Sequence, residues 1–155
     1  MSKVQFLARQ TSHLQHTRCL PWQLLDDPAD MDVPLLGWVS AGQPIEIFEN
    51  SSTVTVPRQL VRRDTYALRV RGNSMIECDI HDGDVIIIDR RETAENGETA
   101  VIMINQREVT LKKLYIERGG VRLQPANEHL SPIYLANEDV EVLGVVMGIK
   151  RQALH

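Results

Sequence analysis

A serine in a tight turn and two adjacent lysines further along the chain are the residues whose types could carry out covalent chemistry. Ser74 follows Gly72 and Asn73, at the end of an alternating stretch over residues 67–71. A hydroxyl held rigidly after a strand can act as a nucleophile, but it is weak until a base takes its proton. Because a serine in a Gly-Asn turn is also an ordinary surface residue, the interpretation depends on finding that base.

Histidine is a common base for serine, yet the histidines of this sequence indicate no ordered partner for Ser74. They lie in the N-terminal segment, a polar turn, a loop and the tail: His13, His16, His81, His129 and His155. A Ser-His-Asp triad therefore stays open but unsupported. A lysine can serve instead when burial lowers its pKa, because desolvation favours the neutral amine.

Lys112 and Lys113 are the candidate lysines, within an apolar stretch over residues 109–116. In a strand they point to opposite faces, with Lys112 on the face of Leu114 and Lys113 on that of Leu111. Alternation alone does not decide which of them is buried. The alternative is a pair of solvated lysines on an edge strand.

The elements that must position these residues are short strands separated by glycine and asparagine turns. Besides the stretch before Ser74, strands are predicted at 45–48, 53–56, 85–89, 99–104, 109–116, 121–123 and 140–149, with one helical turn at 57–61. This pattern predicts a mostly β fold, with barrel-like sheets and small helices.

Residues 1–32 differ from the rest of the chain. Their few apolar residues, such as Leu14 and Trp22, form no long pattern, and Pro21 and Pro28 interrupt what pattern there is. The segment is too short for a helix-turn-helix domain, which needs about three helices. The sequence predicts a weakly structured, extended arm at 1–32, one domain at 33–151, and a tail at 152–155.

The composition places limits on the function. The 155 residues are 43% hydrophobic and 25% charged with a net charge of -4, which fits one domain and an arm and shows no basic nucleic-acid surface. No signal peptide or apolar run of about 20 residues is present, so we expect a soluble, cytoplasmic protein. Cys19 and Cys78 lack metal-ligand spacing and are expected to be reduced thiols. No metal or cofactor is expected.

Four motifs together resemble the self-cleaving domain of the LexA repressor family, serine peptidases that use a Ser-Lys dyad. Gly72–Met75, Asp82–Asp84 and Glu108–Lys112 occur in the family's order and at compatible spacing. Val39–Gly42 is similar to the family's Ala-Gly self-cleavage site. The resemblance covers about residues 33–151 and implies a LexA-like, β-rich peptidase domain.

The resemblance also implies a role for each residue. Ser74 would be the nucleophile and Lys112 the general base, with Lys113 a surface neighbour. The backbone amides of Asn73 and Ser74 would hold the oxyanion of the tetrahedral intermediate.

The bond to be cut would be Ala41–Gly42, in a cleavage loop near 39–46. This loop would swing from an outward to an inward position, bury Lys112 and lower its pKa. In the family, a RecA-ssDNA filament triggers this change, and the proteins are homodimers. Here the stretch 140–146 could supply a dimer strand, although it reads equally well as a core strand.

Three biological roles follow from these observations. The first is a LexA-like transcriptional regulator of the SOS DNA-damage response, although direct DNA binding is not expected without a helix-turn-helix. The second is a UmuD-like subunit of a translesion DNA polymerase, activated by losing a short arm. The third is a dimerisation module without catalysis. A signal-peptidase relative shares the Ser-Lys chemistry but would carry a membrane anchor.

Overall fold

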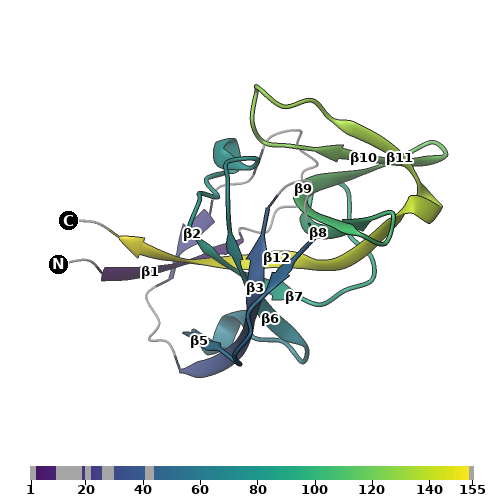
Figure 1. Cartoon of the computed structure of the whole chain (residues 1–155). Helices are drawn as coiled ribbons and strands as arrows, with labels where there is room; N and C mark the ends of the chain where they lie inside the picture. The colour runs from purple at the N-terminus through teal and green to yellow at the C-terminus, as the bar shows by residue number, and fades with distance from the viewer. Residues whose placement is uncertain (1–2, 10–18, 20–21, 26–29, 41–43, 154–155) are drawn as a thin grey trace.

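The computed structural model describes residues 3–9, 19, 22–25, 30–40 and 44–153, and it confirms the predicted β-rich fold (Figure 1). The strands are β1 (Lys3–Arg9), β2 (Trp22–Leu24), β3 (Met31–Val39), β4 (Glu46–Ile47), β5 (Thr53–Val56), β6 (Thr65–Val70), β7 (Val85–Asp89), β8 (Thr99–Ile104), β9 (Glu108–Glu117), β10 (Gly120–Gln124), β11 (Ile133–Ala136) and β12 (Val140–Ala153). Three short 3-10 helices are η1 (Arg58–Leu60), η2 (Ile76–Cys78) and η3 (Asn137–Asp139).

The long C-terminal strand β12 lies at the centre of the sheet, whose order is β11-β10-β9-β8-β12-β7-β6-β3-β4 (Figure 1). Its first half pairs with β8 and its second half with β7, with a register shift in each ladder. Gly144 lies at one of these shifts with φ of +156°, and a Cβ there would overlap the side chain of Ile88. Glycine therefore lets β12 bend from one partner to the next.

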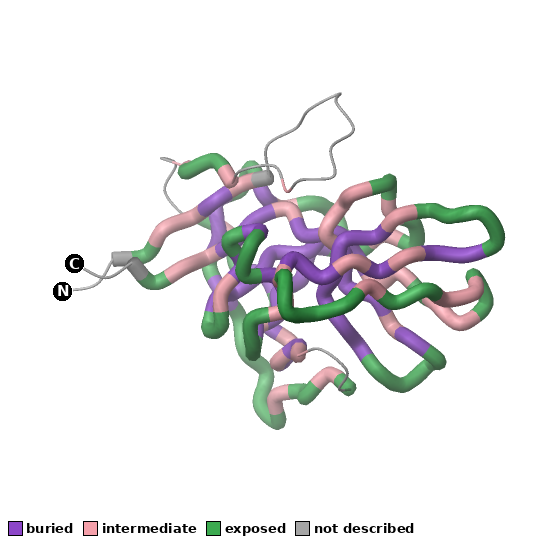
Figure 2. Tube along the Cα trace, turned by 90° about the horizontal axis from the view of Figure 1, so that it is seen from above, coloured by how far each residue is buried: buried purple, intermediate pink, exposed green. Residues whose placement is uncertain are grey.

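Strand β7 illustrates how the sequence builds the core. Ile86 and Ile88 pack into one buried cluster, whereas Val85 and Ile87 pack into another on the opposite face. Both faces of β7 are therefore buried, so its apolar run is continuous rather than alternating, while its edges pair with β12 and β6. Buried positions fill the centre of the molecule in Figure 2.

The N-terminal segment differs from the weakly structured arm that the sequence predicted, because part of it joins the sheet. Strand β1 pairs antiparallel with the end of β12, from Lys3 opposite Ala153 to Ala8 opposite Gly148, and β2 pairs with β1. Leu7 is buried. The end of β12 would otherwise present an unpaired edge, and β1 satisfies its backbone groups.

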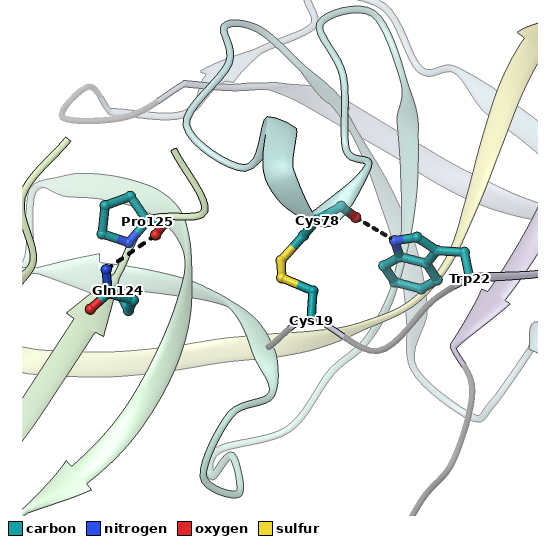
Figure 3. Close-up of a disulfide and its surroundings, with 5 residues drawn as sticks. All are labelled: Cys19, Trp22, Cys78, Gln124 and Pro125. Carbon is teal, nitrogen blue, oxygen red and sulfur yellow. Dashed lines mark hydrogen bonds between the residues drawn. A yellow bond between two sulfur atoms is a disulfide. The ribbon is translucent and has the colours of Figure 1, made fainter. Parts of the chain in front are cut away.

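The expectation of reduced thiols is wrong, because the structure joins Cys19 and Cys78 in a disulfide (Figure 3). Their Cα atoms lie 5.3 Å apart across 59 positions of sequence. The indole Nε1 of Trp22 donates to the carbonyl oxygen of Cys78 at 2.8 Å, which is a second contact between the N-terminal segment and η2. Sequence spacing could not predict this pair, because it depends on the N-terminal segment passing over η2.

Candidate active site

The turn that carries Ser74 connects β6 with η2 and is braced by the Asp82–Asp84 turn. Gly72, with φ of +95°, donates its N–H to Asp82 Oδ1 at 2.8 Å. The amide of Val70 donates to the Asp84 carbonyl at 2.8 Å, and that of Gly83 donates to the Val70 carbonyl at 2.7 Å. These bonds hold the backbone on either side of the serine.

Ser74 itself is half-buried, and its hydroxyl makes no hydrogen bond to any described residue. Likewise, the backbone amides of Asn73 and Ser74 donate to no other residue in the described ranges. Within the described part of the chain, the turn therefore presents one hydroxyl and two amides without a hydrogen-bond partner.

Lys112 lies on β9, directly opposite Ala100 of β8, and its exposed fraction is 3%. Its Nζ donates to Thr110 Oγ1 at 2.6 Å and to the Leu111 carbonyl at 3.3 Å. No carboxylate of the described chain forms an ion pair with it. Burial lowers the pKa of Lys112 from its ordinary 10.5 to about 8, because the charged amine loses its hydration. With this pKa, about one tenth of the amine is neutral at pH 7 and can act as a base.

Lys113 is not the surface neighbour that the resemblance implied, since its exposed fraction is also 3%. Its Nζ lies 5.5 Å from the centre of the Tyr115 ring. With Glu77 it lines a hollow of about 550 Å³ next to the Ser74 turn. Both faces of β9 are covered, so alternation could not separate a buried lysine from an exposed one.

The segment after β10 ties the Ser74 turn to the lysine strand. Ala126 donates its N–H to the Ser74 carbonyl at 2.9 Å, and the side-chain amide of Asn127 donates to the Asn73 carbonyl at 2.9 Å. Two residues earlier, Gln124 pairs with Lys113 in the ladder between β10 and β9. No hydrogen bond joins Ser74 Oγ to Lys112 Nζ, whose donors are directed to Thr110 and Leu111.

The predicted cleavage site, Ala41–Gly42, lies outside the described residues, but the strands on either side of it are described. Strand β3 runs parallel to β6 and ends with the buried Val39, whose carbonyl accepts from the Arg71 amide at 2.9 Å. Strand β4 then returns to pair with β3 at Gly37 and Trp38. Since Arg71 is three positions before Ser74, the loop begins beside the strand that leads into the serine turn.

Sequence reasoning missed Arg71 as a residue of this region. Its Nη1 lies 2.8 Å from Glu46 Oε2, and its guanidinium carbon lies 4.5 Å from the centre of the Trp38 ring. Arg71 thus contacts the strand before the cleavage loop and the strand after it. The only sequence signal was the outward position of an arginine at the end of an alternating stretch.

A second missed residue is Arg151, which holds the Asp82–Asp84 turn from the far end of the chain. Its Nε and Nη2 donate to the two carboxylate oxygens of Asp84 at 2.9 and 2.7 Å. Asp84 is buried, and its Oδ2 also accepts from the His81 amide at 2.8 Å. The sequence revealed the aspartate motif, but its partner lies 67 positions away.

Arg151→Ala is expected to lower the free energy of unfolding by about 3 kcal/mol, because it leaves the Asp84 carboxylate buried without its partner. The matched control is Arg58→Ala, which removes an exposed ion pair with Asp30 and should cost less than about 1 kcal/mol. Urea denaturation at pH 7 measures both values. Equal costs for the two variants would show that Arg151 does not hold the turn.

Two kinds of feature are absent from the described residues. No helix among them is long and apolar enough to cross a membrane. In the same ranges, no group of three or more histidine, cysteine, aspartate or glutamate side chains is arranged to hold a metal ion.

Comparison with known proteins gives consistent results. The family model described as Peptidase S24-like matches residues 34–147, a range that includes Ser74 and Lys112. The LexA repressor of Syntrophobacter fumaroxidans is 43% identical over 122 residues, which cover 78% of this chain and 59% of the relative. That of Desulfitobacterium hafniense is 42% identical over 137 residues, which cover 83% and 66%. That of Herpetosiphon aurantiacus is 44% identical over 128 residues, which cover 77% and 60%. The chain thus spans 59% to 66% of the length of these curated relatives.

Proposed function

Because the chain belongs to the Peptidase S24-like family, we propose that it is a serine peptidase that cuts its own Ala41–Gly42 bond, with Ser74 as nucleophile and Lys112 as general base. The observation that carries the proposal is the state of Lys112. It is an almost fully buried lysine without a carboxylate partner in the described chain, and its pKa is lowered to about 8. A lysine kept only for structure would be expected to pair with an acid or to reach solvent.

The reaction would be an acyl transfer within one chain. The neutral Lys112 amine takes the proton of Ser74 as its Oγ attacks the carbonyl carbon of Ala41. The amides of Asn73 and Ser74 stabilise the oxyanion that forms. The protonated lysine then gives its proton to the leaving amine of Gly42, and water hydrolyses the Ala41 ester on Ser74.

The conformation described here is a resting state in this scheme. Lys112 Nζ is bonded to Thr110 rather than to Ser74, so the amine must reorient before it can take the serine proton. Catalytic hydrogen bonds are often incomplete until the substrate is bound. Entry of the 41–43 loop would supply that substrate and exclude water from both side chains. Loop position and catalysis are therefore coupled.

The biological role that we propose is LexA-like regulation of the SOS response, because proteins named LexA repressor match most of this chain. A RecA-ssDNA filament would favour the inward loop, and a second copy of the chain would form a homodimer. These partners follow from the family resemblance.

The test is incubation of the purified chain between pH 7 and pH 9, followed by mass spectrometry of the products. After reduction of the Cys19–Cys78 disulfide, we expect two pieces, 1–41 and 42–155. The rate should rise roughly tenfold over this range, as the neutral fraction of a lysine with a pKa near 8 rises from about one tenth to nine tenths. The rate constant should not depend on protein concentration. A cut at another bond, or a cleavage rate that does not change with pH, would contradict the proposed mechanism.

A further inference from the structure

The described N-terminal residues are attached to the domain on the other side of the proposed cut. Cys19, which precedes the Ala41–Gly42 bond, is joined by a disulfide to Cys78, which follows it (Figure 3). Cys78 belongs to η2 and lies four positions after Ser74. A cut at residues 41 and 42 would therefore break the backbone while a covalent bond still connects the two pieces.

Non-covalent contacts reinforce this attachment. Leu7 and Trp22 pack in the cluster that contains Met75, whereas Phe6 and Leu25 pack in the second cluster. Strand β1 also continues the sheet along the end of β12. The described part of the N-terminal segment is thus a component of the core and of the sheet, rather than a free tether.

We propose that the Cys19–Cys78 disulfide keeps the N-terminal product of self-cleavage covalently bound to the peptidase domain, so that the cut alone does not separate the two pieces. The partner of this surface is the chain's own segment 1–41. The inference rests on the proposed function, since it concerns the product of that cut. Its consequence is that cleavage and separation of the pieces are two steps, because separation needs reduction of the disulfide and also the withdrawal of β1 and β3 from the sheet.

The exchange chemistry balances with a low-molecular-weight disulfide and its thiol. To close the bond, one cysteine thiolate attacks the small disulfide and expels a small thiolate, and the second cysteine thiolate then displaces the other. Two protein thiols and one small disulfide thus give one protein disulfide and two small thiols. Reduction reverses both steps. Cys19 lines the hollow that also contains Lys113, which gives a small thiol a route to its sulfur.

The experiment uses the full chain, oxidised with glutathione disulfide and then allowed to cut itself at pH 9. On a denaturing gel without reductant, we expect one species, which mass spectrometry should show to be heavier than the uncut chain by one water. Dithiothreitol should divide it into pieces 1–41 and 42–155 on the denaturing gel, whereas gel filtration without denaturant should keep the reduced pieces together, because β3 pairs with β5 and β6. The matched control, Cys19→Ser, should give two pieces on the denaturing gel without reductant.

A second form of the chain separates this inference from the proposed function. A Ser74→Ala variant with a site-specific protease sequence in place of residues 41–43 can be nicked without self-cleavage. If the nicked, oxidised chain falls into two pieces without reductant, the inference is overturned. It is also overturned if the nicked Cys19→Ser form still runs as one species on the denaturing gel without reductant. If the nicked chain behaves as expected but the natural sequence never cuts itself, the inference stands and the proposed function fails.

Discussion

Ser74→Ala is expected to reduce self-cleavage by at least about a thousandfold while leaving the stability unchanged within about 0.5 kcal/mol. The catalytic loss is large because the scheme has no other nucleophile. The free energy of unfolding should not change, because the Ser74 hydroxyl makes no hydrogen bond to any described residue. Removing it therefore leaves no buried group unpaired. Both quantities can be measured on one preparation, by mass spectrometry of pieces formed at pH 9 and by urea denaturation.

Ser51→Ala is the matched control, because it removes the same atom from an exposed serine in the loop between β4 and β5. It should cleave at the rate of the unchanged sequence. If Ser74→Ala still produced a piece that ends at Ala41, another group would be the nucleophile. If it failed to fold, the serine would be a structural residue, and the reading of its turn as a free hydroxyl would be wrong.

The alternating and apolar stretches of the sequence were sufficient to predict most of the sheet. Strands β5, β7 and β8 have the predicted ends, and the predicted strand at 109–116 appears as β9, Glu108–Glu117. β8 and β9 pair with each other across the short turn at 105–107, and β7 pairs with β6, the strand before it. Local pattern and tertiary contacts therefore agree.

Strand β3 was not predicted, because two of its residues disfavour a regular strand. Pro34 lacks a backbone donor, and Gly37 has no side chain to pack. In the structure a Cβ at position 37 would overlap the carbonyl oxygen of Glu46, so the glycine allows β4 to approach closely. Gly37, a residue type that usually indicates a turn, is therefore required here for the packing of β4 against β3.

The residues that support the candidate site could not be predicted from the sequence, for a different reason. Asp84 with Arg151, and Cys19 with Cys78, are pairs separated by 67 and 59 positions. Neither the spacing nor the residue types indicate such a pair. It exists because the end of β12 and the N-terminal segment both pass the Ser74 region. Motifs near the reacting atoms can be recognised locally, whereas the contacts that hold them depend on topology.

Lys112→Met is expected to abolish self-cleavage and at the same time to stabilise the chain by about 2 kcal/mol at pH 7. Below pH 8 the lysine is charged in both the folded and the unfolded chain, so folding bears the full cost of burying its charge. A depression from 10.5 to about 8 corresponds to about 3 kcal/mol, and loss of the hydrogen bond to Thr110 offsets about 1 kcal/mol. Methionine fills a similar volume without a charge.

The sign of the pH dependence distinguishes this explanation from a simple gain in packing. Between pH 8 and 10.5 the folded chain has released the proton of Lys112 while the unfolded chain still holds it, so the stability of the unchanged sequence rises with pH. The increase in the free energy of unfolding caused by Lys112→Met should therefore be complete below pH 8 and disappear as pH approaches 10.5. Urea denaturation of both chains at pH 6, 7, 9 and 10 measures it.

Lys113→Met is the matched control for cleavage, because it changes the adjacent lysine, which is equally buried. It should still cut the Ala41–Gly42 bond, since in the proposed scheme the base is the amine on the opposite face of β9. If Lys113→Met were the variant that lost cleavage, the two lysines would exchange roles. If the advantage of Lys112→Met were the same at pH 7 and pH 10, Lys112 would not carry a lowered pKa and could not be the base. A stabilising substitution that destroys the reaction is the result expected of a charge buried for catalysis rather than for folding.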